Sequence, residues 1–460
     1  MQPETGGAAR LAPSRLLAQA RAWFADASHT RLAQKMAGTA FLIRVASAAI
    51  AYLSQVLMAR WMGPHEFGIY VYVWTWVLLI GGLFDLGLAQ SAPRFIPEYS
   101  GRRQFDLLRG FLHGSRWLVA GIATGAALLA TLAVFLAAPW LEHYLVLPLF
   151  LACLCLPVYA LTGVQEGIGR SYNWVHVGMA PPYILRPLLL LALMSLAYAM
   201  GYPIDATSAM LAAVGACWIT AIVQLLVMNR GLKKTVPAGP KAYEVGGWLR
   251  VSIPIFLVES FYLLLTYTDI LILKQFHSPE EVAVYFAAAK TLALVAFVNF
   301  SVAAAVAHRF TEYHVNGDRE RLSGLLADSI RWTFWPSLGA TAVILALGLP
   351  FLWLFGPEYM KGYPIMFVLA VGLVARAAVG PVERLLNMVG QQNLCAGVYA
   401  FAFILNLVGC LLLVPRFGGM GAAASTSIAL VIESILLFMV TKRRLGLHVF
   451  IFRRAGERQG

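Results

Sequence analysis

Charged residues within long apolar segments are the first candidates for chemistry in this sequence. Moving one such charge into a bilayer costs roughly 3 kcal/mol, so it is tolerated where it faces a polar interior, is hydrated or pairs with an opposite charge. A guanidinium binds two phosphate oxygens at once, and an ammonium supplies a compact charge. We therefore predict a cavity that binds an anionic substrate through Arg44, Arg186, Lys290 and Arg376. The alternative for each cation is an ion pair that only fixes helix packing.

Acidic residues in the same kind of segment are candidates for coupling to a cation. A half-buried carboxylate can bind a proton or a sodium ion, which predicts this role for Glu259 and Asp269. Asp269 lies 10 residues before Pro279 and Lys290 lies 11 after it, so both should sit about 15–16 Å from the same turn. We expect these two residues to form a buried ion pair. For Glu259 the alternative is a pair with a basic residue of another helix, and this is the interpretation that we favour for Glu433.

Polar residues also follow one face of each of two helices, within an arc of about 100°. An offset of 215 residues relates the two faces, because it superposes Arg44 on Glu259 and Ser54 on Asp269. The matching faces predict a cavity between two related halves, although a polar seam between neighbouring helices would give the same pattern. A bend is expected beside Arg186, which follows two prolines. The lining residues expected from the two faces are Ser47, Gln55, Tyr262 and Thr266.

The composition indicates a membrane protein that is all-α and polytopic. Of 460 residues, 60% are apolar and only 12% are charged, with a mean hydropathy of +0.72. Too little polar surface remains to cover a soluble particle, which excludes a water-soluble enzyme. Apolar runs of about 20 residues, long enough to span a bilayer, recur along the chain. The five cysteines lie in such runs without the spacing of a disulfide framework or a zinc site, so no metal or other cofactor is expected.

Twelve transmembrane helices fit the sequence, and the distribution of Lys and Arg supports this count. Segments expected on the cytoplasmic side hold 27 of these residues, against 4 in the alternate loops. Both termini are therefore expected in the cytoplasm. Anionic lipids, and no nucleic acid, explain the net charge of +13. The predicted spans are 37–60, 66–89, 117–138, 146–166, 172–200, 207–229, 247–273, 282–307, 330–350, 363–384, 394–414 and 420–441.

An internal repeat divides these spans into two pseudo-symmetric six-helix lobes around a central cavity. The repeat aligns Pro64 with Pro279 and Glu66 with Glu281, between the first two spans of each half. A half with six spans, an even number, begins and ends on the same side of the membrane, so the two halves are parallel repeats. Parallel repeats with a site between them are typical of an alternating-access transporter. The predicted domains are a basic amphipathic cytoplasmic segment (1–35), an N-lobe (36–229), a cytoplasmic linker (230–246), a C-lobe (247–441) and a basic cytoplasmic tail (442–460).

Several segments resemble a known family. Leu57–Tyr70, Phe84–Leu88 and Arg94–Glu98, with an echo in Asp269–Lys290, are similar to polysaccharide-transport (Wzx-like) flippases of the multidrug/oligosaccharidyl-lipid/polysaccharide exporter superfamily. The resemblance covers about residues 36–441 and implies transfer of undecaprenyl-pyrophosphate-linked oligosaccharides across the bacterial inner membrane for O-antigen, capsule or exopolysaccharide assembly. It implies as partners an anionic lipid-linked oligosaccharide, a proton or sodium gradient, membrane lipids and polymerase or chain-length proteins.

Three other functions fit the sequence less well. A membrane polymerase, ligase or lipid-linked glycosyltransferase generally needs outer loops that hold acidic, His or Arg groups around the acceptor. The outer loops here are short, their acids are sparse, and they show no general acid–base pair. An ATP-driven pump is disfavoured because the chain lacks a G-x-x-x-x-G-K-[ST] loop, although a separate ATPase partner would escape this test. A cation-coupled drug or metabolite antiporter on the same fold stays open, but the first helix carries only Arg44 where drug antiporters commonly carry an acid. We therefore expect a transporter and no enzyme.

Overall fold

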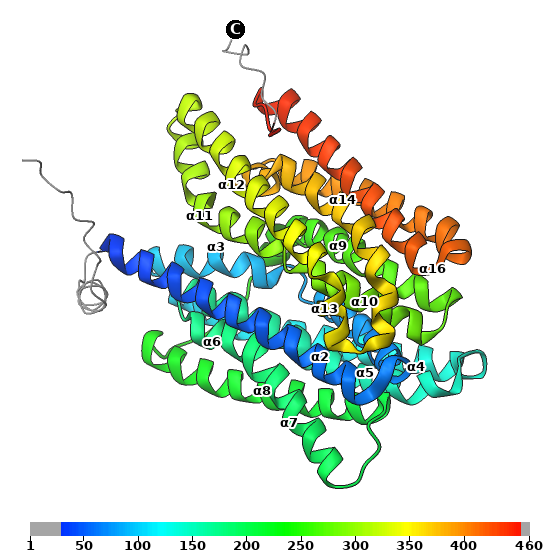
Figure 1. Ribbon diagram of the computed structural model, residues 1–460. Helices are drawn as coiled ribbons and strands as arrows, with labels where there is room; N and C mark the ends of the chain where they lie inside the picture. The colour runs from blue at the N-terminus through cyan, green and yellow to red at the C-terminus, as the bar shows by residue number, and fades with distance from the viewer. Residues whose placement is uncertain (1–28, 452–460) are drawn as a thin grey trace, which may run out of the picture.

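The computed structural model describes residues 29–451, and it describes side chains from Ala46 onward except at positions 304, 307, 308, 311 and 315. Every element assigned in this range is helical (Figure 1). The predicted amphipathic segment 1–35 therefore lies almost entirely outside the described residues, as does the end of the basic tail.

Helix α2 (His29–Leu83) opens the described chain and is broken at Gly63, whose positive φ of 75° favours glycine. The break falls between the first two predicted spans. The rest of the first half consists of α3 (Leu88–Gly101), α4 (Phe105–Ala137), the short η1 (Ala138–Trp140), α5 (His143–Ser171), α6 (Val175–Ala180), the π-helical η2 (Pro181–Leu185), α7 (Arg186–Ala199) and α8 (Ala206–Thr235).

The second half of the chain ends in a helix that is also broken at a glycine. Gly418, inside α16 (Gln392–Leu445), has a φ of 52°, and a Cβ there would overlap the carboxylate of Glu281. The positive φ therefore favours glycine at this break, and a Cβ would also displace the Glu281 carboxylate. The preceding elements are α9 (Val245–Phe276), α10 (Pro279–Ala293), α11 (Ala296–Val315), α12 (Arg319–Ala346), α13 (Gly348–Phe355), η3 (Pro357–Gly362), α14 (Tyr363–Val379) and α15 (Val382–Met388).

Many of these helices are long and apolar enough to cross a membrane. The described residues contain eight such helices, or up to ten if each of two bent pairs, α10 with α11 and α12 with α13, is counted as one span. The protein is thus an all-α, multi-pass membrane protein, as predicted. A count of twelve also needs α2 and α16 to be divided at their glycine breaks, and that number stays a prediction.

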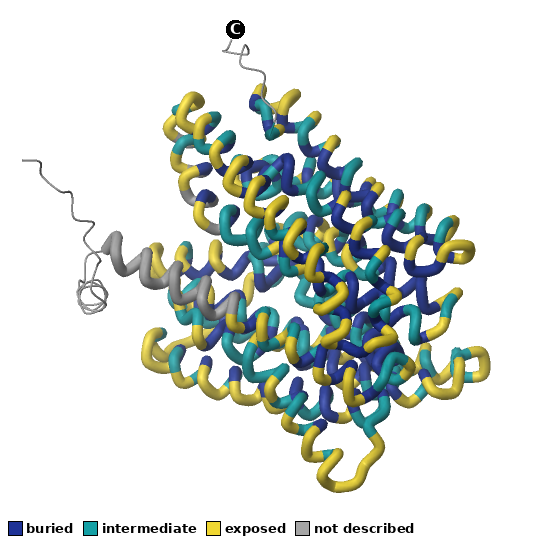
Figure 2. Tube along the Cα trace, in the orientation of Figure 1, coloured by how far each residue is buried: buried dark blue, intermediate teal, exposed yellow. Residues whose placement is uncertain are grey.

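The two halves of the chain meet along α2 and α10. Helices α2 to α8 occupy the lower part of the view in Figure 1 and α9 to α16 the upper part, with α10 and α13 packed against α2. Buried residues concentrate along the middle of the molecule, and exposed residues lie on its outside (Figure 2). In the apolar part of α4 large apolar side chains are exposed, such as Leu128 at 67% and Leu129 at 70%. An apolar outer surface is expected where helices face lipid rather than water.

Two matching contacts support the predicted internal repeat. Glu66 accepts a hydrogen bond from the backbone N–H of Ala206, where α8 begins, at 2.8 Å. Glu281 accepts one from the N–H of Gly419, where α16 resumes after its break, at 2.7 Å. A carboxylate at a helix start satisfies an unpaired N–H and favours the positive end of the helix dipole. Residues that the repeat aligns in sequence therefore perform the same structural task in each half.

Candidate functional site

A cavity of about 660 Å³ lies where the two halves of the chain meet. Its walls come from α2, α5, η2, α7 and α8 on one side and from α9, α10 and α11 on the other. This volume lies within the range of roughly 300–1,000 Å³ that is usual for ligand sites. Much of the wall is aromatic, from Tyr52, Tyr70, Trp74, Tyr159, Tyr183, Tyr267, Phe286 and Phe297.

The structure brings together part of the predicted site. The predicted residues that line this cavity are Arg186, Lys290, Asp269, Ser47, Gln55 and Thr266. Among described side chains, its lining does not include Glu259, Tyr262 or Arg376. The side chain of Arg44 lies outside the described residues, although its backbone belongs to α2.

Arg186 is held between aromatic rings at the first-half wall of the cavity. Its guanidinium carbon lies 5.0 Å from the ring centroid of Tyr159 and 5.7 Å from that of Trp74. Such cation–π contacts stabilise a guanidinium without neutralising its charge. Among the described residues no carboxylate forms an ion pair with Arg186. No described carboxylate therefore neutralises the charge of this arginine.

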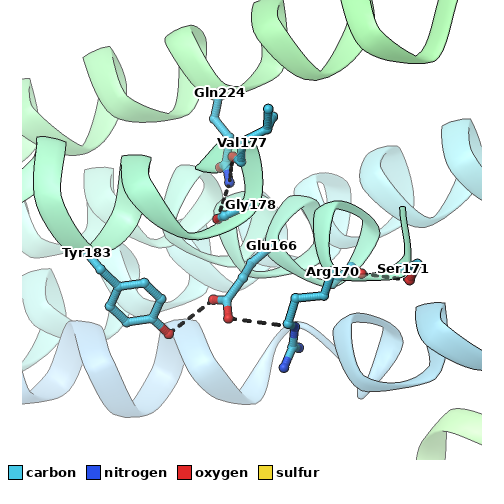
Figure 3. Close-up of polar contacts among 8 residues, drawn as sticks. Glu166, Arg170, Ser171, Val177, Gly178, Tyr183 and Gln224 are labelled. Carbon is cyan, nitrogen blue, oxygen red and sulfur yellow. Dashed lines mark hydrogen bonds and ion pairs between the residues drawn. The ribbon is translucent and has the colours of Figure 1, made fainter. Parts of the chain in front are cut away.

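One turn earlier, Tyr183 connects the cavity wall to a charged pair on α5. Its hydroxyl donates a hydrogen bond to Glu166 at 3.1 Å, and Glu166 also lies 3.8 Å from Arg170, one turn along the same helix (Figure 3). The arrangement fixes the tyrosine ring beside the cavity. It also keeps the carboxylate of Glu166 engaged with two polar partners.

Lys290 and Asp269 both line the cavity, but the predicted ion pair between them is absent from the described contacts. Asp269 instead accepts hydrogen bonds from the Tyr285 hydroxyl at 2.5 Å, the Ile270 N–H at 2.8 Å and the Thr426 hydroxyl at 3.3 Å. The ammonium of Lys290 lies 5.2 Å from the ring of Phe286. The prediction of a direct pair was wrong for this structure because nearby hydroxyl groups satisfy the carboxylate first.

Arg376 forms ion pairs within the second half, away from the described cavity lining. Its guanidinium lies 3.6 Å from Glu433, which is fully buried, and 3.6 Å from Glu383. It also donates to the Tyr399 hydroxyl at 3.3 Å and lies over the Tyr262 ring at 5.4 Å. The pairing expected for Glu433 is confirmed, with Arg376 as its partner. Tyr262 contacts this cluster and belongs to it rather than to the cavity wall in this structure.

Glu259 lies among charges contributed by both halves. The charged groups that influence it are the carboxylates of Glu383 and Asp85 and the guanidinium groups of Arg384 and Arg170. No described side chain forms an ion pair with it at less than 4.0 Å. The alternative of a pair with one basic residue is therefore not found among the described side chains, and a looser cluster of mixed sign surrounds Glu259 instead.

The two halves are also joined at one end of the bundle, which we call the turn end (residues 60–66 and 274–281). There Lys274 contacts Glu142 at 2.5 Å and His65 contacts Glu280 at 2.6 Å. Arg60 donates to the backbone carbonyls of Trp353 and Leu354, each at 2.7 Å. Every one of these contacts links the first half to the second, and His65 and Glu280 are themselves related by the 215-residue offset.

The hydrogen bond and the charge of Lys274 stabilise the Glu142 carboxylate at the turn end. Partial burial raises the pKa of this carboxyl, but the hydrogen bond and charge of Lys274 outweigh it and hold the pKa below its usual range. A depressed pKa means that the interaction is present at neutral pH and is lost only as the pH falls through that lowered value. The contact is therefore fully formed at physiological pH.

Comparison with protein families decides the family of the chain. The family described as polysaccharide biosynthesis protein matches residues 35–314, more than half of the chain. The chain belongs to the polysaccharide biosynthesis protein family. A second family, MatE, matches residues 254–412. These matches confirm the resemblance to Wzx-like flippases of the multidrug/oligosaccharidyl-lipid/polysaccharide exporter superfamily.

The names of individual relatives of the chain are consistent with this family. A putative O-antigen transporter of Shigella flexneri is 22% identical over 412 residues, covering 84% of this chain and 92% of the relative. A probable low-salt glycan biosynthesis flippase of Haloferax volcanii is 20% identical over 219 residues, covering 47% of this chain and 45% of the relative. Both are named as transport proteins, and the expectation of a transporter rather than an enzyme is confirmed.

Solved structures show the same fold. An inward-facing multidrug resistance MATE family transporter has a TM-score of 0.71 at 15% identity, covering 88% of this chain and 98% of that one. The lipid II flippase MurJ has a TM-score of 0.67 at 15% identity, covering 87% of each chain. At this identity the likeness establishes the fold of the chain. It does not identify the substrate.

Neither the aromatic wall nor the Glu166–Tyr183 contact was predicted from the sequence as part of the site. Aromatic residues are common in membrane helices, so their number gives no sign of which ones share a cavity. The one available signal was the proline pair before Tyr183, which predicted a bend. The structure places the π-helical segment η2 at this position.

Proposed function

We propose that this protein flips lipid-linked oligosaccharides from the cytoplasmic to the periplasmic leaflet of the bacterial inner membrane. The proposed substrate carries undecaprenyl pyrophosphate, and the product feeds O-antigen, capsule or exopolysaccharide assembly. Family membership and the named O-antigen transporter and glycan flippase relatives support this class of substrate.

The observation that carries the proposal is the pair of cations in the cavity, one from each half. Arg186 on α7 and Lys290 on α10 both line it, while the carboxylate of Asp269 is occupied by hydroxyl and backbone donors. A diphosphate suits this arrangement, because a guanidinium binds two of its oxygens and an ammonium neutralises a further charge. The aromatic wall suits the sugars, since rings such as Tyr and Trp combine an apolar face with a polar edge.

Alternating access supplies the direction of movement. We propose that the lobes, residues 36–229 and 247–441, rock against each other about the linker 230–246, with both termini in the cytoplasm. The turn end then faces the periplasm, as the distribution of Lys and Arg predicts. Its contacts join the halves in this structure and must break before substrate leaves on that side. Polymerase and chain-length proteins would receive the product.

Coupling to a proton or sodium gradient is proposed for Glu259 and Asp269, two membrane carboxylates that form no ion pair among the described residues. Glu259 lies in a mixed cluster at the interface of the halves, and Asp269 lies in the cavity wall. Arg44 and Arg376 remain in the proposal as further substrate cations. Because Arg376 is paired with Glu433 and Glu383 here, it would contribute only in a state in which those pairs open.

Glycan export in cells that depend on this gene tests the proposal. Arg186→Ala and Lys290→Ala should each lower surface glycan per molecule of protein by at least about tenfold, the loss expected for one charged hydrogen bond. Arg186→Lys should restore export only in part, because it loses bidentate binding. The matched controls are Lys361→Ala and Arg416→Ala, which remove exposed cations outside the cavity lining and should export normally. Normal export by both cavity variants would refute the proposal.

A drug or metabolite antiporter is the second candidate, favoured by the MatE match over residues 254–412. Expression in cells that lack their own drug exporters distinguishes the two. Drug resistance that depends on Arg186, without any effect on glycan export, would replace the flippase proposal with this one.

A further inference from the structure

We propose that Gln224, on α8, is a positioning residue that sets the direction of Tyr183 and Arg186 without lining the cavity. Its relevance to transport rests on the proposed function, but the geometry that assigns it does not. Gln224 is fully buried and is not among the residues of the cavity wall. It acts on the cavity through the π-helical segment η2, which is the break between α6 and α7.

Two consecutive prolines create that break. In an α-helix each N–H bonds to the carbonyl four residues earlier, and proline has no N–H. Pro181 and Pro182 therefore deprive the carbonyls of Val177 and Gly178 of their usual donors. Buried carbonyl groups without a donor are costly, especially in a membrane, so another group must supply one.

The carboxamide of Gln224 supplies the missing donors from a neighbouring helix. Its nitrogen donates to the Gly178 carbonyl at 3.0 Å and to the Val177 carbonyl at 3.4 Å (Figure 3). Its oxygen accepts from the side chain of Gln165, on α5, at 3.5 Å. A primary amide has two N–H groups, so one side chain can serve both carbonyls that the prolines leave open. The match between two freed acceptors and two donors is the basis of the assignment.

The break decides where the cavity residues point. Across η2 the N–H of Arg186 donates to the carbonyl of Pro181, five residues back, so the turn contains one more residue than an α-turn. If this segment returned to an α-helix, the residues after it would rotate by about 100°. Such a rotation would remove Arg186 from the rings of Trp74 and Tyr159 and would separate Tyr183 from Glu166. By holding the carbonyls before the break, Gln224 favours the π-turn over that alternative.

Hydrogen exchange of the full-length protein in lipid nanodiscs, followed by mass spectrometry, tests the assignment without any substrate. Gln224→Met keeps the size of the side chain and removes both donors. We expect backbone exchange in residues 177–190 to accelerate by about tenfold and exchange elsewhere in the described helices to stay unchanged. Gln224→Asn keeps the amide but shortens its reach, and it should give the same local effect if the Met variant folds poorly.

The matched control is Thr220→Val, one turn earlier on the same helix. Thr220 is buried, and its hydroxyl has no hydrogen-bond partner among the described residues. This variant also exchanges a buried polar group for an apolar one of equal shape, but it leaves the break alone. It should not alter exchange in residues 177–190.

A rescue variant separates positioning from general stability. Adding Pro182→Ala to Gln224→Met restores a backbone N–H for the Gly178 carbonyl, so exchange should return most of the way to that of the wild type. Export per molecule by Gln224→Met should fall by about tenfold, as for loss of the Arg186 contact itself.

Several results would overturn the assignment. These are unchanged exchange in both Gln224 variants, uniform acceleration along the chain, an equal effect of Thr220→Val, no rescue by Pro182→Ala, or local acceleration with normal export. If Arg186→Ala and Lys290→Ala both export normally, the substrate proposal fails, and the exchange result still shows whether Gln224 holds the break.

Discussion

Opening of the turn end can be tested by removing one charge that joins the two halves. Glu142→Gln keeps the shape of the side chain but leaves the Lys274 ammonium, 6% exposed, without its counter-charge. Because the Glu142 side chain is 53% exposed, solvent screening limits the pair to about 1 kcal/mol, the upper part of the range for surface ion pairs. A change of about 1 kcal/mol shifts the ratio of open to closed molecules by about fivefold. Adding Arg60→Ala removes a separate contact, and the two effects should multiply.

The assay is the labelling rate of a cysteine introduced into the cavity. Ala51→Cys replaces a small residue of the lining on α2. On the proposed topology, we expect a membrane-impermeant maleimide added from the periplasmic side to reach it when the turn end opens. The five native cysteines are buried, and the protein without Ala51→Cys measures their background. We expect labelling to be about fivefold faster in Glu142→Gln and faster again in the double variant.

A matched control keeps the chemistry of the substitution and changes its place. Glu98→Gln removes an ion pair to Arg102, at 2.9 Å, that joins α3 to the residue directly after it and stays within the first half. It should leave the labelling rate unchanged. If Glu142→Gln labels no faster than this control, the contacts at the turn end do not hold the halves together, and the reasoning is refuted.

Three further predictions follow from contacts in the two halves. Tyr285→Phe removes the 2.5 Å donor to the buried Asp269 and should lower the free energy of unfolding by about 1–3 kcal/mol. Tyr70→Phe, at the repeat-related position in the cavity wall, removes no such donor to a carboxylate among the described residues and should have less effect. Thermal unfolding of the purified protein measures both, and equal losses would contradict the assignment. Glu66→Ala and Glu281→Ala each remove a carboxylate from a helix start and should each lower the same free energy by about 1 kcal/mol; a loss in only one would count against equivalent roles. Reporter fusions after Gly239 and Asp318 should report cytoplasm and those after Pro203 and Glu358 periplasm, and a periplasmic signal from Gly239 would break the twelve-span topology.

Much of the helical fold could be predicted from the sequence, because a membrane span is defined by its length and apolarity. The predicted span 146–166 lies within α5, and 207–229 lies within α8. Predicted ends were less accurate where a helix continues beyond its apolar part. Helix α4 begins at Phe105, twelve residues before the predicted span at 117, because its first turns carry Asp106, Arg109 and Arg116. Hydropathy detects the part of a helix within lipid and not its polar extension.

The side-chain partners were harder to predict, for a physical reason. Counting from a turn gives the depth of a residue in the membrane, and on that basis Asp269 and Lys290 were expected to meet. The direction of each side chain around its helix depends on packing with other helices, and Tyr285 and Thr426 occupy the space around Asp269. Arg376 shows the same limit, because its partner Glu433 comes from a helix far along the chain. Depth is a local property of the sequence, whereas direction is set by tertiary contacts.

The repeat preserves positions in the cavity but not their charges. The 215-residue offset that relates His65 to Glu280 also relates Ser54 to Asp269 and Thr75 to Lys290. All four of these last residues line the cavity, yet the first half presents hydroxyl groups where the second presents a carboxylate and an ammonium. The cation of the first half, Arg186, comes instead from the proline-broken segment and lies among aromatic rings. Two halves with the same backbone plan therefore offer different surfaces to one ligand. A substrate with a charged end and a neutral sugar end is itself asymmetric, and binding it requires the two walls to differ in this way.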